Sequence, residues 1–182
     1  MTSDKVRKTI FTGLCAAIIF IGISIFRISV PAIVGRPFIH FGNTFAVISV
    51  MILGFRAGAA ASVIGLGMFD ILNGYAATSW ITMLEAVALA AVTAAVFKAV
   101  DYHEGQMGKL YLVSFSAGLI KLFTSWLAGL TESLMVGTQF KVAAVNAFLS
   151  LPAAAINSIA TFIIVPLIYI ALEKTVLKKV RL

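Results

Sequence analysis

Polar side chains between residues 38 and 85 gather at the ends of long apolar runs. They stand at the start of one run, the end of the next and the start of a third: His40, Asn43, Asp70, Asn73, Tyr75, Trp80 and Glu85. Only the short sequence GFRAG separates the first two runs, so if both cross a bilayer these side chains meet at one membrane face. Because polar groups are costly in a membrane, such a cluster indicates a ligand site.

The residue types in this cluster suit a small heteroaromatic molecule. An amide, a phenol, an indole and two carboxylates can hydrogen-bond to such a ring and stack on it. Tyr75 and Trp80 would also fit an aromatic belt at the membrane surface, and Asp70 could be a solvated helix end. Glu85 lies deeper than such a belt, more than one turn inside its apolar run, and this depth favours a binding site.

Lys121 lies near the middle of the apolar run 110–130, where an ammonium group needs a partner. Glu85 is the predicted partner. The lysine could contact a ligand, form a purely structural ion pair, or extend its side chain along the bundle to water. Three more polar residues are candidates for ligand contact or helix packing: Arg36 in the preceding 30–38 loop, Asn146 near the same face, and Asn157 deeper, where a bond to another helix is expected.

Catalysis and metal binding find little support in the chain. The two histidines, His40 and His103, fall in segments expected on opposite sides of the membrane, so they cannot form a metal site together. The sequence has no GxSxG, HExxH or phosphate-binding glycine-rich motif. We therefore expect neither an enzyme nor a cofactor, and ATP hydrolysis, if it drives transport, would take place in partner subunits.

Composition places the chain among polytopic membrane proteins. Apolar residues make up 61% and charged residues 12%, and the mean hydropathy is +1.06. The 182 residues have room for about six spans of roughly 20 residues each. We expect an all-α integral membrane protein, one domain over 1–182 and a six-transmembrane-helix bundle, with spans near 9–29, 39–53, 57–72, 80–100, 110–130 and 143–172, the last bent at Pro152 and Pro166.

The net charge is +7, and the basic residues flank the expected spans. They are not arranged as a groove that would bind nucleic acid. With six spans, the side that holds both termini receives ten basic residues: Lys5, Arg7, Lys8, Arg56, Lys98, Lys109, Lys174, Lys178, Lys179 and Arg181. The other side receives three, namely Arg27, Arg36 and Lys141. Basic residues favour the cytoplasmic side, so we expect cytoplasmic termini in a bacterial plasma membrane and outward loops at 30–38, 73–79 and 131–142.

A stripe of small residues marks the first apolar run. Thr9, Gly13 and Ala17 recur every four residues and would face the same side of a helix. Small side chains let another helix approach closely. This helix could belong to a partner protein or to the same bundle.

The chain resembles the substrate-binding S components of energy-coupling factor (ECF) vitamin transporters. The resemblance is most specific in IHFGNTFAVISVMILGFRAGAAASVIG and the following FDILNGY, which look like the riboflavin, pyridoxine and hydroxymethylpyrimidine branches. It implies a bundle that binds a vitamin near its outer face, with the first outward loop as a gate. It also implies docking, through the first helix, onto a transmembrane coupling subunit that works with two ATPase subunits. The family usually carries AxxxA in this helix, and Gly13 is a mild departure from it.

Within that family, the polar and aromatic set favours a small pyrimidine or pyridine, such as hydroxymethylpyrimidine or a B6 vitamer. Riboflavin ranks next and pantothenate third. The alternative function is a stand-alone ion-coupled transporter that uses Glu85 and Lys121 as a proton relay. It is disfavoured because the chain has too few spans for a typical two-repeat carrier.

Overall fold

The computed structural model describes residues 3–30 and 38–177. Within these ranges the chain forms six α-helices, a short two-stranded ribbon and a terminal π-helical turn: α1 (Ser3–Ser24), β1 (Ile28–Ser29), β2 (Phe38–Ile39), α2 (Gly42–Leu72), α3 (Ser79–Ala99), α4 (Met107–Met135), α5 (Phe140–Leu149), α6 (Leu151–Leu172) and η1 (Glu173–Leu177). Five of these helices, α1, α2, α3, α4 and α6, are long and apolar enough to cross a membrane. The described part of the chain is therefore almost entirely helical and has five candidate membrane spans.

Helix α2 is broken at Gly54, where the backbone turns out of the helical conformation. Gly54 has φ 77° and ψ 175°, a conformation that glycine adopts without steric cost because it has no Cβ. A Cβ built on Gly58 would lie 2.5 Å from Cα of Val50. In a continuous helix eight residues span about 12 Å, so this contact means that the chain folds back on itself. The predicted turn at GFRAG is confirmed, and α2 consists of two arms, 42–53 and 55–72, that pack side by side.

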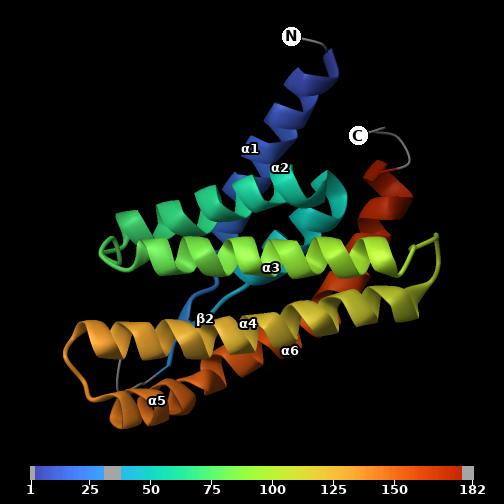
Figure 1. The fold of residues 1–182 in the computed structure, drawn as a ribbon. Helices are drawn as coiled ribbons and strands as arrows, with labels where there is room; N and C mark the ends of the chain where they lie inside the picture. Colours follow the sequence, from blue (N-terminus) through green and yellow to red (C-terminus); the bar gives the residue numbers. More distant parts are fainter. Residues whose placement is uncertain (1–2, 31–37, 178–182) are drawn as a thin grey trace.

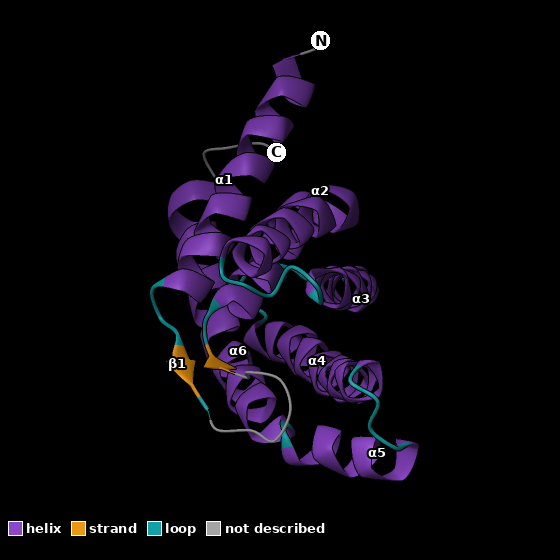
Figure 2. Ribbon diagram, turned by 90° about the vertical axis from the view of Figure 1, so that its left-hand side faces the viewer, coloured by secondary structure: helices purple, strands orange, loops and turns teal. Residues whose placement is uncertain are grey.

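The long helices lie side by side, and the loops between them lie at the two ends of the molecule (Figure 1). The second arm of α2 packs on α3, α3 on α4, and α4 on α6, while α1 crosses α2 and projects beyond the bundle. The loops 73–78 and 136–139 lie at the left in Figure 1, and the loop 100–106 lies at the right. Figure 2 views α3 and α4 nearly end-on and shows the β1–β2 ribbon beside α6.

Close packing of α1 against α2 depends on a glycine at the crossing. Ala16, Ile19 and Ile23 form the buried face of α1. A Cβ built on Gly65 would lie 2.7 Å from the backbone oxygen of Ala16, so a larger side chain there would force the two helices apart. This contact packs α1 against the second arm of α2.

Three predicted boundaries were wrong, each for a local reason. The run 143–172 is not one bent helix, because the chain breaks at Ser150 into α5 and α6; Pro152 then occupies the first turn of α6, where its missing N–H costs nothing. Pro166 lies inside α6 without ending it. Helix α4 continues to Met135, so residues 131–135 belong to a helix and not to an outward loop. The first helix ends at Ser24, since residues 28–29 pair with β2.

Candidate functional site

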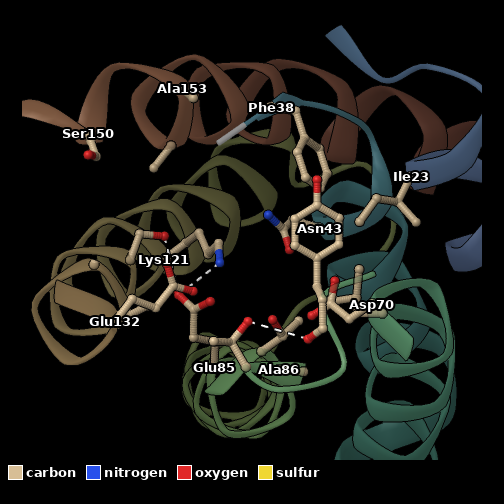
Figure 3. Close-up of a pocket in the computed structure, with 18 of the residues that line it drawn as sticks. Ile23, Phe38, Asn43, Asp70, Glu85, Ala86, Lys121, Glu132, Ser150 and Ala153 are labelled. Carbon is tan, nitrogen blue, oxygen red and sulfur yellow. Dashed lines mark hydrogen bonds and ion pairs between the residues drawn. The ribbon is translucent and has the colours of Figure 1, made fainter. Parts of the chain in front are cut away.

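A cavity of about 680 Å³ lies between α2, α3, α4 and α6 (Figure 3). Its volume falls in the range of small-molecule sites, roughly 300 to 1,000 Å³. Tyr75 and Thr78 of the 73–78 loop line it, as do Met135 and Val136 at the end of α4. The cavity therefore reaches the end of the molecule where the sequence predicted the polar cluster to gather.

An ion pair between Glu85 and Lys121 forms part of the cavity wall. Nζ of Lys121 donates to Oε1 of Glu85 at 2.9 Å, and Oγ of Ser125 donates to the same oxygen at 3.2 Å. The side chains of Glu85 and Lys121 are only 13% and 15% exposed. The predicted pairing of α3 with α4 through these residues is confirmed. Because an ammonium has three N–H donors, Lys121 keeps donors for another group in the cavity.

Two further carboxylates line the same cavity from opposite sides. Asp70 on the second arm of α2 is 6% exposed and hydrogen-bonds with the side chain of Thr82. Glu132 on α4 lies across the cavity from Asp70 (Figure 3). Sequence reasoning missed Glu132 because it placed residue 132 in a loop. The signal that could have found it is helical spacing, since Lys121, Ser125 and Glu132 follow one face of α4.

Asn43 and His40 present hydrogen-bond donors to the cavity. Asn43 is 4% exposed, and its Nδ2 has no hydrogen-bond partner among the described residues. Its amide points into the cavity in Figure 3. Nδ1 of His40 accepts the backbone N–H of Gly42 at 3.0 Å, so in the neutral ring the proton is on Nε2.

Asn157 of α6 uses both ends of its amide to hold strand β2 and His40, the residue that follows it. Its Oδ1 accepts the backbone N–H of His40 at 2.9 Å, and its Nδ2 donates to the backbone oxygen of Phe38 at 3.0 Å. Sequence reasoning expected Asn157 to bond another helix, but its partner is the strand. Asn157 also lines the cavity, so it both borders the site and positions two other lining residues.

A cluster of aromatic side chains forms the side of the cavity next to β2. Ring centroids of Phe38 and Phe69 are 5.6 Å apart, and those of Phe38 and Tyr75 are 6.1 Å apart. The guanidinium of Arg27 lies over Phe38 and Phe69, at 5.7 and 5.4 Å from the centroids. Phe38 and Tyr75 line the cavity and offer ring surfaces on which a flat ligand can stack.

The structure brings six of the ten predicted ligand-contact residues into the cavity wall: His40, Asn43, Asp70, Tyr75, Glu85 and Lys121. The other four are Asn73, Trp80, Asn146 and Arg36. Asn73 donates from Nδ2 to the backbone oxygen of Phe69, Trp80 is 47% exposed, and Asn146 lies on α5 outside the lining. Arg36 lies outside the described residues. In the described part of the chain, no three His, Cys, Asp or Glu side chains are grouped to hold a metal ion.

The small-residue stripe of α1 faces away from the bundle. Thr9, Gly13 and Ala17 are exposed, and a Cβ built on Gly13 would meet no atom within 4 Å. The buried Ala16 and Ile19 lie on the neighbouring face of α1. Packing within the bundle therefore does not account for the stripe.

Comparisons with known proteins give a matching family and a similar fold. Residues 3–174 match the family of ECF-type riboflavin transporter S components. The fold is similar to the solved structure of ThiT from Listeria monocytogenes, with a TM-score of 0.69 and 16% sequence identity over 97% of this chain and 98% of that one. No curated protein matches the chain at a significant level.

Proposed function

Because the chain belongs to the family of ECF-type riboflavin transporter S components, we propose that it captures a small water-soluble vitamin in the cavity between α2, α3, α4 and α6. The observation that carries this proposal is Nδ2 of Asn43, which is buried in the cavity wall without a hydrogen-bond partner among the described residues and points into the cavity. A buried donor without a partner is unfavourable, so a bound ligand would satisfy it.

The proposed topology has six membrane-embedded segments, with the two arms of α2 counted separately. Both termini are cytoplasmic and the cavity opens outward in a bacterial cell membrane. Ten basic residues against three support this orientation. The start of α1 and the end of α6 also lie on the same side of the molecule in Figure 1, which fits an even number of crossings.

The proposed substrate is a heteroaromatic vitamin or precursor. The rings of Phe38 and Tyr75 support stacking with a flat ligand, which fits hydroxymethylpyrimidine, a B6 vitamer and riboflavin. Pantothenate, the last of the sequence-based candidates, is an anion without a ring. The carboxylates of Asp70, Glu85 and Glu132 disfavour it, because like charges repel.

Binding without nucleotide is the direct test. Calorimetry on the detergent-extracted protein should detect one of hydroxymethylpyrimidine, pyridoxine, pyridoxamine, riboflavin and pantothenate with no ATP present. Mass spectrometry of the small molecule that co-purifies with the protein provides an independent identification. Absence of binding to every member of this panel would contradict the proposal.

Delivery of the vitamin is proposed to require an ECF module, with a transmembrane coupling subunit and two ATPase subunits. The exposed stripe Thr9, Gly13 and Ala17 would contact the coupling subunit, because small side chains permit close helix approach. Replacing Gly13 and Ala17 together with Leu should abolish uptake in cells that contain the module and leave vitamin affinity within about twofold, since the stripe lies outside the cavity lining. Uptake in cells that lack every such module would instead support a stand-alone ion-coupled transporter.

A further inference from the structure

The cavity contains more negative than positive charge among the described residues. Its ionisable lining groups include three carboxylates, Asp70, Glu85 and Glu132, and one ammonium, Lys121. Glu85 and Lys121 neutralise each other at 2.9 Å. The described residues offer neither Asp70 nor Glu132 an ion-pair partner. Arg27, over the Phe38 and Phe69 rings, is not part of the lining.

This excess of negative charge is energetically unfavourable in the protein without a ligand. Asp70 is 6% exposed and has the Thr82 side chain as a hydrogen-bond partner. An ionised carboxylate removed from water is strongly disfavoured without a counter-charge. Asp70 and Glu132 face the same space from α2 and α4, so both would attract a positively charged ligand in that space (Figure 3).

A separate observation concerns the hydrogen-bonding groups that a ligand would need. Nδ2 of Asn43 is buried, finds no partner in the described part of the chain, and points into the cavity. It donates hydrogen bonds, so its complement is a ring nitrogen, hydroxyl or carbonyl oxygen. A ligand that pairs with both Asn43 and the carboxylates would therefore combine a hydrogen-bond acceptor with a positive charge.

We propose that the cavity selects a cationic heteroaromatic vitamin, one whose ring carries a protonated amine or ring nitrogen, over the uncharged riboflavin. Asp70 and Glu132 supply the counter-charges, Asn43 donates to an acceptor on the ring, and Phe38 and Tyr75 stack on its face. This inference rests on the proposed function, because it names the chemical class of the vitamin that the same cavity takes.

Matched ligand pairs test the charge requirement by calorimetry on the full-length protein in detergent. Pyridoxamine and pyridoxine differ by an ammonium in place of a hydroxyl, and 4-amino-5-hydroxymethylpyrimidine is paired with its 4-hydroxy counterpart. One of the two pairs should bind. Within that pair, we expect the Kd of the aminated compound to be about tenfold or more below the Kd of the hydroxyl compound. Its Kd should also be below that of riboflavin. Equal or tighter binding of riboflavin or of the uncharged member would overturn this inference and leave the proposed function standing.

Variants of the two carboxylates locate the effect. Asp70→Asn and Glu132→Gln should each reduce the preference for the aminated ligand about tenfold while keeping the shape of the side chain. The matched control is Asp101→Asn, which removes a carboxylate that is 86% exposed at the opposite end of the molecule. Asn tolerates the positive φ of 46° at position 101. A preference that survives both cavity variants would overturn the assignment, and thermal unfolding of each variant verifies that it is folded.

Binding to no member of the panel would contradict the proposed function itself, and this inference would fail with it. Failure of the charge requirement alone gives a different result, since riboflavin or an uncharged ring would then bind without dependence on Asp70 or Glu132.

Discussion

The two ends of the helical bundle use similar residues for different purposes. At the end with the loop 100–106, Phe97, Tyr102 and Tyr169 pack ring against ring, with centroids 5.6 to 5.9 Å apart. The hydroxyl of Tyr102 donates to Glu173 at 2.8 Å and ties this loop to η1. At the other end, the rings of Phe38 and Tyr75 and the carboxylates of the wall surround a cavity.

The difference lies in how the polar groups are satisfied. At the Tyr102 end, the carboxylate and the phenol satisfy each other, and burial together with Glu173 raises the pKa of Tyr102 to about 12. The phenol therefore remains a donor throughout the neutral range. At the cavity end, Nδ2 of Asn43 lacks a hydrogen-bond partner and Asp70 lacks a counter-charge among the described residues. Polar groups that a protein leaves unsatisfied around a space indicate where a ligand binds.

The largest expected effect comes from breaking the ion pair in the cavity wall. Replacing Lys121 with Met leaves Glu85 charged and without its counter-ion, and should cost about 3 to 5 kcal/mol of stability. Replacing Glu85 with Gln leaves the ammonium of Lys121 uncompensated and should be destabilising in the same way. Thermal or denaturant unfolding in detergent measures both losses.

The double variant Glu85→Gln/Lys121→Met shows whether the pair acts as a unit. Since neither charge is then left alone, its loss should be smaller than the sum of the two single losses. Strictly additive losses would mean that the two side chains do not interact, and the cavity end would then lack its one satisfied charge pair.

An intermediate effect is expected from the amide that holds β2. Asn157→Ala removes both hydrogen bonds to the strand and should cost about 1 to 3 kcal/mol. It should also weaken vitamin binding, because Phe38 and His40 lose the contact that positions them. Calorimetry and thermal unfolding measure the two effects. Asn146→Ala on α5 is the matched control, since Asn146 lies outside the cavity lining; equal effects of the two changes would contradict the positioning role.

The smallest effect is expected at the end without the cavity. Tyr102→Phe keeps the ring packing and removes only the hydrogen bond to Glu173, which should cost about 1 kcal/mol. Vitamin affinity should not change. A loss of affinity in this variant would mean that the two ends are coupled, and the contrast between a binding end and a purely structural end would not hold.

Some features of this protein follow from the sequence alone because they depend on local chemistry. Length and hydropathy indicated a helical membrane protein, and the glycine in GFRAG marked the turn between the arms of α2. Lys121 had to find a partner because an ammonium at mid-span cannot be left alone, and Glu85 was the nearest carboxylate in depth.

Other features were decided by tertiary contacts. Glu132 entered the cavity wall because α4 continues past residue 130, and Asn157 met a strand that the hydropathy pattern does not reveal. Trp80 and Asn73 are close in sequence to Asp70 and Tyr75, yet Trp80 is exposed and neither lines the cavity. The physical reason is helix rotation: spacing along the chain sets the depth of a residue in the membrane, whereas packing against neighbouring helices decides which face is turned inward.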